Sequence, residues 1–321
     1  MAVYTEVGDD ELARFVAGYD IGALLSAKGI AEGVENSNYL LHTEKAFFIL
    51  TLYEKRVKQE ELPFFIGLME HLNRRGLNCP LPVANRAGKA LGELAQRPAA
   101  IVTFLDGMGV KRPKAAHCGA VGEALARLHE AGRDFAMERR NALTVDGWRP
   151  LFDRAQDRAD TVSPGLVARA EHALSSLERE WPKDLPRGVI HADLFPDNVF
   201  FIGQELSGLI DFYFACTDFL SYDLAVCLNA WCFEPDASFN LTKGQAMIAG
   251  YERVRKLEDA EIAALPLLCR GAALRFMLTR LVDWLNVPPG ALVRPKDPLE
   301  YDRKLSVHSR VTSAREYGLM R

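Results

Sequence analysis

"VIHADLFPDNVFF", residues 189–201, is the segment that decides the fold of this 321-residue chain. Two apolar, strand-like runs flank a histidine, two aspartates and an asparagine. Polar groups that are buried cost free energy unless they are hydrogen-bonded or paired, and catalytic groups are often found on loops that a rigid scaffold fixes. We therefore predict a hairpin-like frame that holds His191, Asp193, Pro196 and Asn198 on its loop.

A further acidic residue ends the next apolar run, in "LSGLIDFYF" (residues 206–214). Mg²⁺ binds a few carboxylate or carbonyl oxygens together with phosphate oxygens and water, so Asn198 and Asp211 are candidate metal ligands. Asp193 then remains to accept a proton from a hydroxyl nucleophile. This division of roles is typical of phosphoryl transfer, in which the enzyme mainly positions groups and neutralises charge.

The spacing H-x-D-x-x-x-x-N matches the catalytic loop of protein kinases, and Asp211-Phe212 matches the start of their D-F-G motif. The alternative is a polar β-turn with an incidental aspartate, and the ordered match of His191, Asp193, Pro196 and Asn198 argues against it. We expect His191 to brace the loop rather than to transfer protons.

The pattern of apolar residues changes along the chain. Residues 23–53 are β-rich between two helical segments, and from residue 113 onward the periodicity is mostly helical. We predict an N-terminal nucleotide-binding lobe over residues 1–104 and a C-terminal catalytic and substrate-binding lobe over residues 105–321, with a hinge at 106–109. The proline-rich segment 286–305 is expected to be extended.

Composition excludes several classes of function. Net charge is −4 without a basic block, which argues against a nucleic-acid partner. The six cysteines lack metal-site spacing and are expected to be free, buried thiols. The N-terminus lacks the features of a signal peptide, and no stretch approaches the roughly 18 apolar residues of a membrane span. We expect a cytoplasmic protein by default.

A candidate phosphate-binding turn lies in "AEGVENSNYLL", residues 31–41. Backbone N–H groups in such a turn can cradle phosphate oxygens, which makes Gly33, Asn36, Ser37 and Asn38 candidate nucleotide-binding residues. Taken alone, the segment also fits an ordinary hairpin loop. Its position ahead of the catalytic-loop motif favours the nucleotide interpretation.

With these motifs the chain resembles the aminoglycoside-phosphotransferase-like kinases, which share the protein-kinase fold. The resemblance also covers softer stretches, among them "GVENSNYLLHT", "LARLHEAG" and "ALRFMLTRL". It implies an α+β, bilobal, protein-kinase-like fold with a small β-rich N-lobe, a larger helical C-lobe and the active site in the cleft. It further implies ATP as donor, Mg²⁺ held by Asn198 and Asp211, Asp193 as base, and adenine near Phe104 and Leu105.

Within this family the chain most resembles bacterial members that phosphorylate L-homoserine. The resemblance therefore implies O-phospho-L-homoserine as the product, on the route to threonine. Sibling kinases of choline, methylthioribose, fructosamine or aminoglycosides remain alternatives, as does a nucleotide-binding pseudokinase. Oligomeric state is open.

One position departs from the kinase pattern. Kinases carry a lysine on the strand after the glycine-rich loop, paired with a helical glutamate. In "FILTLYEKR" (residues 48–56) Thr51 occupies that place, and Phe65 and Gly67 stand where the glutamate is expected. The phosphates could then be bound by backbone groups of the candidate turn, by Asn36, Ser37 and Asn38, or by Lys55.

The acceptor site requires a cation for a carboxylate, ideally an arginine that binds both oxygens. Arg275 in "ALRFMLTRL" is the candidate, with Tyr213 and Trp231 as further substrate-binding candidates. Asp223 fits a first-turn acid of a helix, and His129 fits a structural hydrogen-bonding residue near a helix end.

Overall fold

The computed structural model describes residues 5–30, 36–54, 58–287 and 295–320. This part of the chain forms two compact units. The first unit contains the described residues up to Asp106 together with Gly208–Tyr213, and the second contains Gly107–Ser207 and the described residues from Phe214 onward. Within the described residues, the chain returns to the first unit with the segment that carries Asp211.

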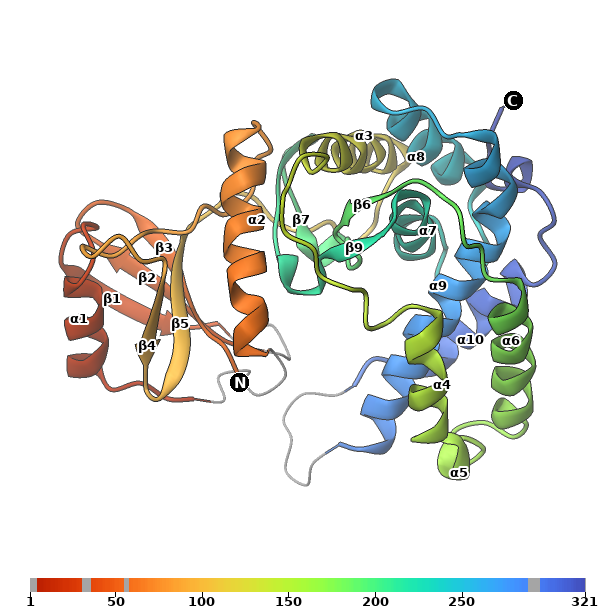
Figure 1. Cartoon of the computed structure of the whole chain (residues 1–321), viewed down its shortest axis with the longest axis horizontal. Coiled ribbons are helices and arrows are strands. Elements are labelled where there is room, and N and C mark those ends of the chain that lie inside the picture. Colours follow the sequence, from red (N-terminus) through yellow and green to blue (C-terminus); the bar gives the residue numbers. More distant parts are fainter. Residues whose placement is uncertain (1–4, 31–35, 55–57, 288–294, 321) are drawn as a thin grey trace. The chain divides into compact units, whose positions relative to one another are not determined.

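The first unit is built on an antiparallel five-stranded sheet with the strand order β1-β2-β3-β5-β4. Its strands are β1 (Leu24–Gly29), β2 (Ser37–Thr43), β3 (Phe47–Leu52), β4 (Leu91–Leu94) and β5 (Arg97–Thr103). Helix α1 (Asp9–Ala17) covers one face of the sheet, and α2 (Leu62–Arg74) lies on the other (Figure 1).

The alternation of side chains along β3 separates these two faces. Leu50 and Leu52 belong to the core that includes Leu12 and Val16 of α1. Because successive side chains point to opposite faces of a sheet, Thr51 faces the side of α2. The register fixes this arrangement, since Thr51 pairs with Asn38 of β2 and with Ala100 of β5.

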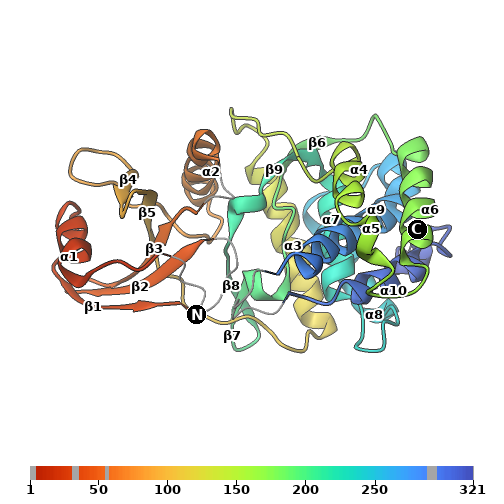
Figure 2. The same cartoon turned by 90° about the horizontal axis from the view of Figure 1, so that it is seen from below.

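The second unit is mostly helical (Figures 1 and 2). Its helices are α3 (Ala115–Ala131), α4 (Val145–Asp153), α5 (Gln156–Ala159), α6 (Leu166–Glu180), α7 (Leu220–Trp231), α8 (Leu241–Val254), α9 (Asp259–Leu285) and α10 (Pro298–His308). It also contains strands β6 (Arg187–Ile190), β7 (Val199–Ile202) and β9 (Cys216–Phe219), together with the first three residues of β8 (Glu205–Leu209). Strand β6 pairs with β9, and β7 pairs with β8.

These pairings correct the predicted hairpin-like frame. The strands on either side of the catalytic loop, β6 and β7, do not pair with each other, because each takes a different partner. Strand β9, which has four residues and follows closely after the Asp211 segment, was not predicted. The loop is therefore anchored to two separate strand pairs.

The predicted extended segment 286–305 is wrong over its second half, where α10 begins at Pro298. Proline is favoured in the first turn of a helix because it has no N–H to leave unpaired. The Asp297 side chain caps this helix by accepting a hydrogen bond from the N–H of Leu299 at 2.8 Å. Residues 288–294 lie outside the described part.

Helix α9 corrects the expectation that no segment is long and apolar enough for a membrane span. It contains an 18-residue window of mean hydropathy 1.5 and passes that test by length and composition alone. However, 61% of this window is buried, and α9 packs against α4, α6, α7 and α10. These features are typical of the core helix of a globular unit.

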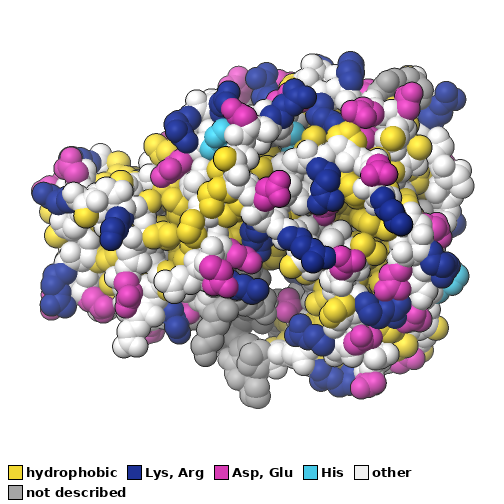
Figure 3. Space-filling view, viewed as in Figure 1, with side chains coloured by type: hydrophobic (Ala, Val, Ile, Leu, Met, Phe, Trp, Pro, Cys, Tyr) yellow, Lys and Arg dark blue, Asp and Glu magenta, His cyan; other side chains and the backbone are white. Residues whose placement is uncertain are grey.

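All six cysteines are free and buried, as predicted. Lys and Arg side chains are interspersed with Asp and Glu over the described surface that Figure 3 shows. This distribution agrees with a net charge of −4 spread over 82 charged residues, 39 basic and 43 acidic.

Candidate active site

The predicted catalytic loop joins β6 to β7 in the second unit. Within it, Ala192 adopts a left-handed backbone conformation with φ 62°, and Pro196–Asn198 form a 3₁₀ turn. A left-handed conformation is unfavourable for alanine and persists only where the surroundings impose it. The contacts of Ala192 with its neighbours explain how this conformation is held.

A buried carboxylate holds the amide side of this backbone. Asp223, on α7, accepts hydrogen bonds from the N–H groups of His191 at 2.7 Å and Ala192 at 2.8 Å. His129 supports it from α3, with Nε2 at 3.2 Å from Asp223 Oδ2. Burial alone would raise the pKa of Asp223, but the hydrogen bond with His129 and its neighbours keep that pKa below its ordinary value.

Arg275 holds the carbonyl side of the same residue. Its Nη1 donates to Ala192 O at 2.6 Å, and its guanidinium lies over the ring of Phe276 at 4.4 Å. The side chain is only 2% exposed. Asp223 and Arg275 thus hydrogen-bond to the N–H and the C=O of Ala192, which explains how a non-glycine residue keeps a left-handed backbone there.

The side chains of Asp193 and Asn198 face each other across the loop. Asn198 Nδ2 donates to Asp193 O at 2.8 Å and to Asp193 Oδ2 at 3.2 Å. The amide nitrogen is therefore turned toward the aspartate, and the amide oxygen Oδ1 is turned away from it. His191 is fully buried, and its Nδ1 accepts from the N–H of Asp193 at 3.3 Å.

Asp193 is half-buried. Burial raises the pKa of its carboxyl group, and the nearby charge of Arg275 opposes that rise. A raised pKa brings a carboxylate closer to the working pH of an enzyme, which favours general-base catalysis. The loop can therefore present an oriented base next to an amide oxygen.

Trp231 supports the loop from α7. Its Nε1 donates to Leu194 O at 2.7 Å, and the side chain is 1% exposed. Its single polar atom is thus engaged by the loop backbone. Trp231 and Arg275 were both predicted to contact substrate, and the structure places both beneath the loop.

Asp211 lies in the first unit, is exposed, and has a left-handed backbone with φ 63°. Phe212, the next residue, is buried. Tyr213, the third predicted substrate residue, lies in the same unit against Tyr53 and Phe65.

The predicted nucleotide-binding residues are also in the first unit. Gly33 lies outside the described residues, as does Lys55. Two of the turn residues bond to Glu54, since Ser37 Oγ donates to its carboxylate at 2.7 Å and Asn36 Oδ1 accepts from its N–H at 3.3 Å. Asn38 accepts a hydrogen bond from the Thr51 hydroxyl at 2.8 Å.

Phe104, predicted to lie near the adenine, is exposed, and Leu105 beside it is half-buried. The ring centroids of Phe104 and Phe47 are 6.1 Å apart. Phe104 and Leu105 lie in the first unit, directly after strand β5.

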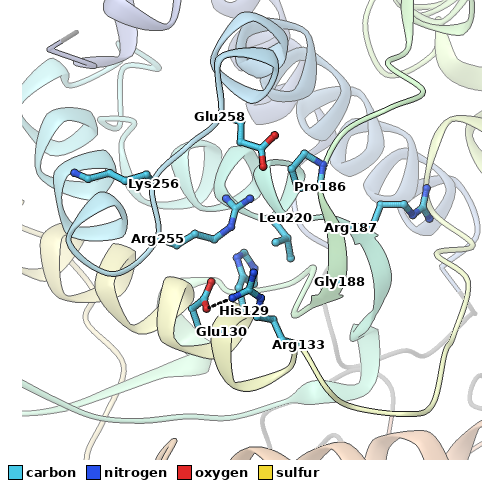
Figure 4. Close-up of a pocket in the computed structure, with 10 residues that line it drawn as sticks. All are labelled: His129, Glu130, Arg133, Pro186, Arg187, Gly188, Leu220, Arg255, Lys256 and Glu258. Carbon is cyan, nitrogen blue, oxygen red and sulfur yellow. Dashed lines mark hydrogen bonds and ion pairs between the residues drawn. The ribbon is translucent and has the colours of Figure 1, made fainter.

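A pocket of about 410 Å³ opens on the second unit beside the His129–Asp223 pair (Figure 4). It is lined by His129, Glu130, Arg133, Pro186, Arg187, Gly188, Leu220, Arg255, Lys256 and Glu258. Tyr251 joins Arg255 to His129, with its hydroxyl 3.1 Å from Arg255 Nη1 and 2.8 Å from His129 Nδ1. None of the predicted site residues lines this pocket.

Among the described residues no group of three or more His, Cys, Asp or Glu is arranged to hold a metal ion. The donor types nevertheless suit Mg²⁺, which takes few protein oxygens and fills its shell with phosphate and water. The Asn198 amide oxygen is turned away from Asp193, and the carboxylate of Asp211 is exposed. These two groups fit the predicted ligand roles by their chemistry.

Sequence reasoning missed Asp223 as a functional support. Its signal was a single acid in the otherwise apolar helix "LSYDLAVCLNAW" (residues 220–231). An acid at 0% exposure requires a buried partner, and the catalytic-loop amides are that partner.

Residues 26–257 match the phosphotransferase enzyme family. A homoserine kinase of Methylobacterium nodulans is 68% identical over 318 residues, which cover 99% of each chain. A homoserine kinase of Bradyrhizobium diazoefficiens is 67% identical over 321 residues, which cover 100% of this chain and 98% of the relative.

Solved structures share the fold at low identity. Amicoumacin kinase, in complex with AMP-PNP, Ca²⁺ and its ligand, has a TM-score of 0.69 at 15% identity and covers 96% of this chain and 92% of its own. A spectinomycin phosphotransferase has a TM-score of 0.67 at 13% identity and covers 98% of each chain. The α+β, protein-kinase-like fold predicted from the sequence is therefore confirmed.

Proposed function

This chain belongs to the phosphotransferase enzyme family, and we propose that it transfers the γ-phosphoryl group of ATP to the side-chain hydroxyl of L-homoserine. The product is O-phospho-L-homoserine, an intermediate on the route to threonine. The observation that carries this proposal is the identity of 65–69% over nearly the whole chain to relatives named homoserine kinase. The likeness to kinases of other acceptors is confined to the fold.

Asp193 is the proposed base. Its carboxylate accepts the proton of the acceptor hydroxyl as the oxygen attacks phosphorus, and Asn198 orients it through the 3.2 Å contact with Oδ2. Because phosphoryl transfer demands mainly positioning, rigid support of the loop is part of the mechanism. Asp223, Arg275 and Trp231 supply that support in this proposal, although Arg275 and Trp231 were first expected to contact the substrate.

Asn198 and Asp211 are the proposed protein ligands of Mg²⁺. A bound Mg²⁺ neutralises charge on the phosphate oxygens of ATP. Asn36, Ser37, Asn38, Phe104 and Leu105 remain proposed nucleotide contacts, and we extend this proposal to Gly33. Six buried thiols without disulfides suit the reducing cytoplasm, where we place the reaction.

The test is an ADP-release assay with Mg²⁺-ATP against a panel of acceptors: L-homoserine, choline, kanamycin, methylthioribose and fructosamine. We expect turnover with L-homoserine to exceed that with every other acceptor by at least about 100-fold, because unpaired polar groups in a site reject the wrong ligand strongly. Turnover with another acceptor and none with L-homoserine would overturn the proposed substrate. ATP binding without turnover on any acceptor would support a pseudokinase.

A further inference from the structure

The position of the kinase lysine holds a neutral cluster in this chain. Thr51 is 2% exposed and faces the side of the sheet that α2 covers. At the glutamate position on α2 stands Phe65, which is fully buried. The lysine–glutamate pair of protein kinases therefore has no counterpart at these two positions, and other groups must join β3 to α2.

Tyr213 makes that connection. Its ring meets Tyr53 edge-on at 5.4 Å and Phe65 edge-on at 5.8 Å between centroids. Its hydroxyl lies 3.3 Å from the hydroxyl of Tyr53 and close to the side chain of Thr51. We call Thr51, Tyr53, Phe65 and Tyr213 the tyrosine cluster, and all four lie in the first unit.

The hydroxyl groups of the tyrosine cluster can form one chain of hydrogen bonds in which each hydroxyl donates to the next. Thr51 donates to Asn38 Oδ1 at 2.8 Å, so its oxygen is open to accept from Tyr213. Tyr213 in turn can accept from Tyr53. Each of the three hydroxyls can then donate once along a chain that ends on the amide oxygen of Asn38, which leaves none of these three donors unpaired.

The tyrosine cluster carries no charge near neutral pH. The hydroxyl of an ordinary tyrosine ionises only near about pH 10, and threonine and phenylalanine have no group that ionises below that pH. A buried ion pair gains its Coulomb energy only after both charges lose their water, and well-packed neutral groups often replace such a pair without loss of stability. The exchange of an ion pair for aromatic contacts and hydroxyl bonds is therefore energetically reasonable.

The tyrosine cluster also fixes the segment that carries Asp211. On one side of Asp211, the N–H of Leu209 donates to Asn78 O at 3.0 Å. On the other side, Tyr213 is held by the tyrosine cluster. Asp211 lies between these two anchors with a left-handed backbone, a conformation that a non-glycine residue keeps only under such constraint.

We propose that Tyr213 is a positioning residue, which aligns Asp211 for the metal–nucleotide complex in place of the lysine–glutamate pair. The inference rests on the proposed function only in taking Asp211 as a metal ligand. It predicts that the hydroxyl of Tyr213 matters for binding the metal-loaded nucleotide. The acceptor alcohol does not enter this prediction.

The test is Tyr213→Phe, which removes the hydroxyl and keeps the aromatic contacts. We would measure the dissociation constants of AMP-PNP by calorimetry, with Mg²⁺ and with EDTA. We expect about five-fold weaker binding of the Mg²⁺ complex, the equivalent of one hydrogen bond, with metal-free binding unchanged. Thr51→Val, which removes the hydroxyl next in the chain, should act in the same direction.

Tyr19→Phe is the matched control. Tyr19 is a buried tyrosine of the same unit, 3% exposed, and its hydroxyl has no hydrogen-bond partner among the described residues. This variant should bind both forms of the nucleotide as the parent chain does. Circular dichroism of all variants checks that the fold is retained.

Asp211→Asn separates the failure of this inference from the failure of the proposed metal role. If Asp211→Asn weakens the Mg²⁺ complex while Tyr213→Phe does not, the positioning role of Tyr213 is wrong and the metal role stands. If neither variant changes the dependence on Mg²⁺, Asp211 is not a metal ligand and the inference loses its basis.

Discussion

The carboxylate of Asp223 accepts a hydrogen bond from the N–H of Ala192 at 2.8 Å and so ties helix α7 to the catalytic loop. This bond joins the core of the second unit to the residue directly before Asp193. Because Ala192 is left-handed, the loop depends on its surroundings for its shape. The position of the proposed base therefore depends on a residue that is fully buried.

Substituting Asp223→Asn tests that dependence. An asparagine offers one acceptor oxygen in place of two, so one buried N–H of His191 or Ala192 loses its partner. We expect a loss of about 2–4 kcal/mol in unfolding free energy and a drop of about 10- to 100-fold in kcat from misplacement of Asp193. Urea unfolding and steady-state kinetics measure the two effects.

Asp160→Asn is a matched control for this substitution. Asp160 also accepts a backbone hydrogen bond, from Val167 N at 2.9 Å, but it is exposed. We expect less than about 1 kcal/mol of destabilisation there and an unchanged kcat. Equal effects of the two variants on kcat would contradict the role of Asp223 in loop positioning.

Arg275→Met distinguishes loop support from substrate binding. The variant loses the 2.6 Å bond to Ala192 O but keeps much of the apolar volume. If Arg275 supports the loop, kcat falls about 10- to 100-fold and the KM for L-homoserine changes little. A large rise in that KM with kcat preserved would instead show that Arg275 binds the carboxylate of the substrate.

Arg270→Met serves as the control on the same helix. Its ion pair with Glu180, at 3.2 Å, is partly exposed, and such pairs contribute little to stability. Neither kcat nor KM should change in this variant. A comparable kinetic defect would indicate that any lost charge on α9 disturbs the site.

The buried His308 predicts a loss of stability in acid. Burial lowers the pKa of this imidazole from 6.5 to about 3, and the charge of Lys304 acts in the same direction. The unfolded chain therefore takes up a proton near pH 6.5 that the folded chain refuses, so stability falls as pH drops from 6.5 toward 3. At pH 5 this one group destabilises the fold by about 2 kcal/mol relative to pH 7.

His308→Gln should remove this part of the acid sensitivity. We would measure the free energy of unfolding by urea titration at pH 7 and at pH 5. The difference between these two values should be about 2 kcal/mol smaller in the variant than in the parent chain. The variant is less stable at pH 7, because His308 hydrogen-bonds to Tyr317 at 2.7 Å and to Asn229 at 3.0 Å. The exposed His172→Gln should leave the pH dependence unchanged, and an unchanged dependence in His308→Gln would refute the assignment.

How far the sequence predicts this molecule depends on the range of each interaction. The catalytic loop is a local pattern, so the spacing of His191, Asp193 and Asn198 predicted both the fold and the chemistry. Asp223 joins residues more than thirty positions away, and its own helix indicates only that it is buried. A single sequence contains no signal for such a contact.

The errors in secondary structure have similar causes. Strand β9 has four residues and pairs with β6 across a long stretch of sequence, so its local pattern is too short to predict it. Pro298 was taken as a sign of extended chain, although proline is also favoured in the first turn of a helix. The sequence shows only that Thr51 stands where kinases carry a lysine. The side chains that take the place of the lysine–glutamate pair can be identified only from their contacts in the folded chain.

The proposed reaction and its base can be tested together by single-turnover phosphoryl transfer from radiolabelled ATP to L-homoserine, with the parent chain and with Asp193→Asn. We expect labelled O-phospho-L-homoserine from the parent chain and a rate at least about 100-fold lower in the variant, with nucleotide affinity unchanged. Equal rates in the two proteins would contradict the role of Asp193 as base, and the absence of labelled product from the parent chain would contradict the proposed reaction.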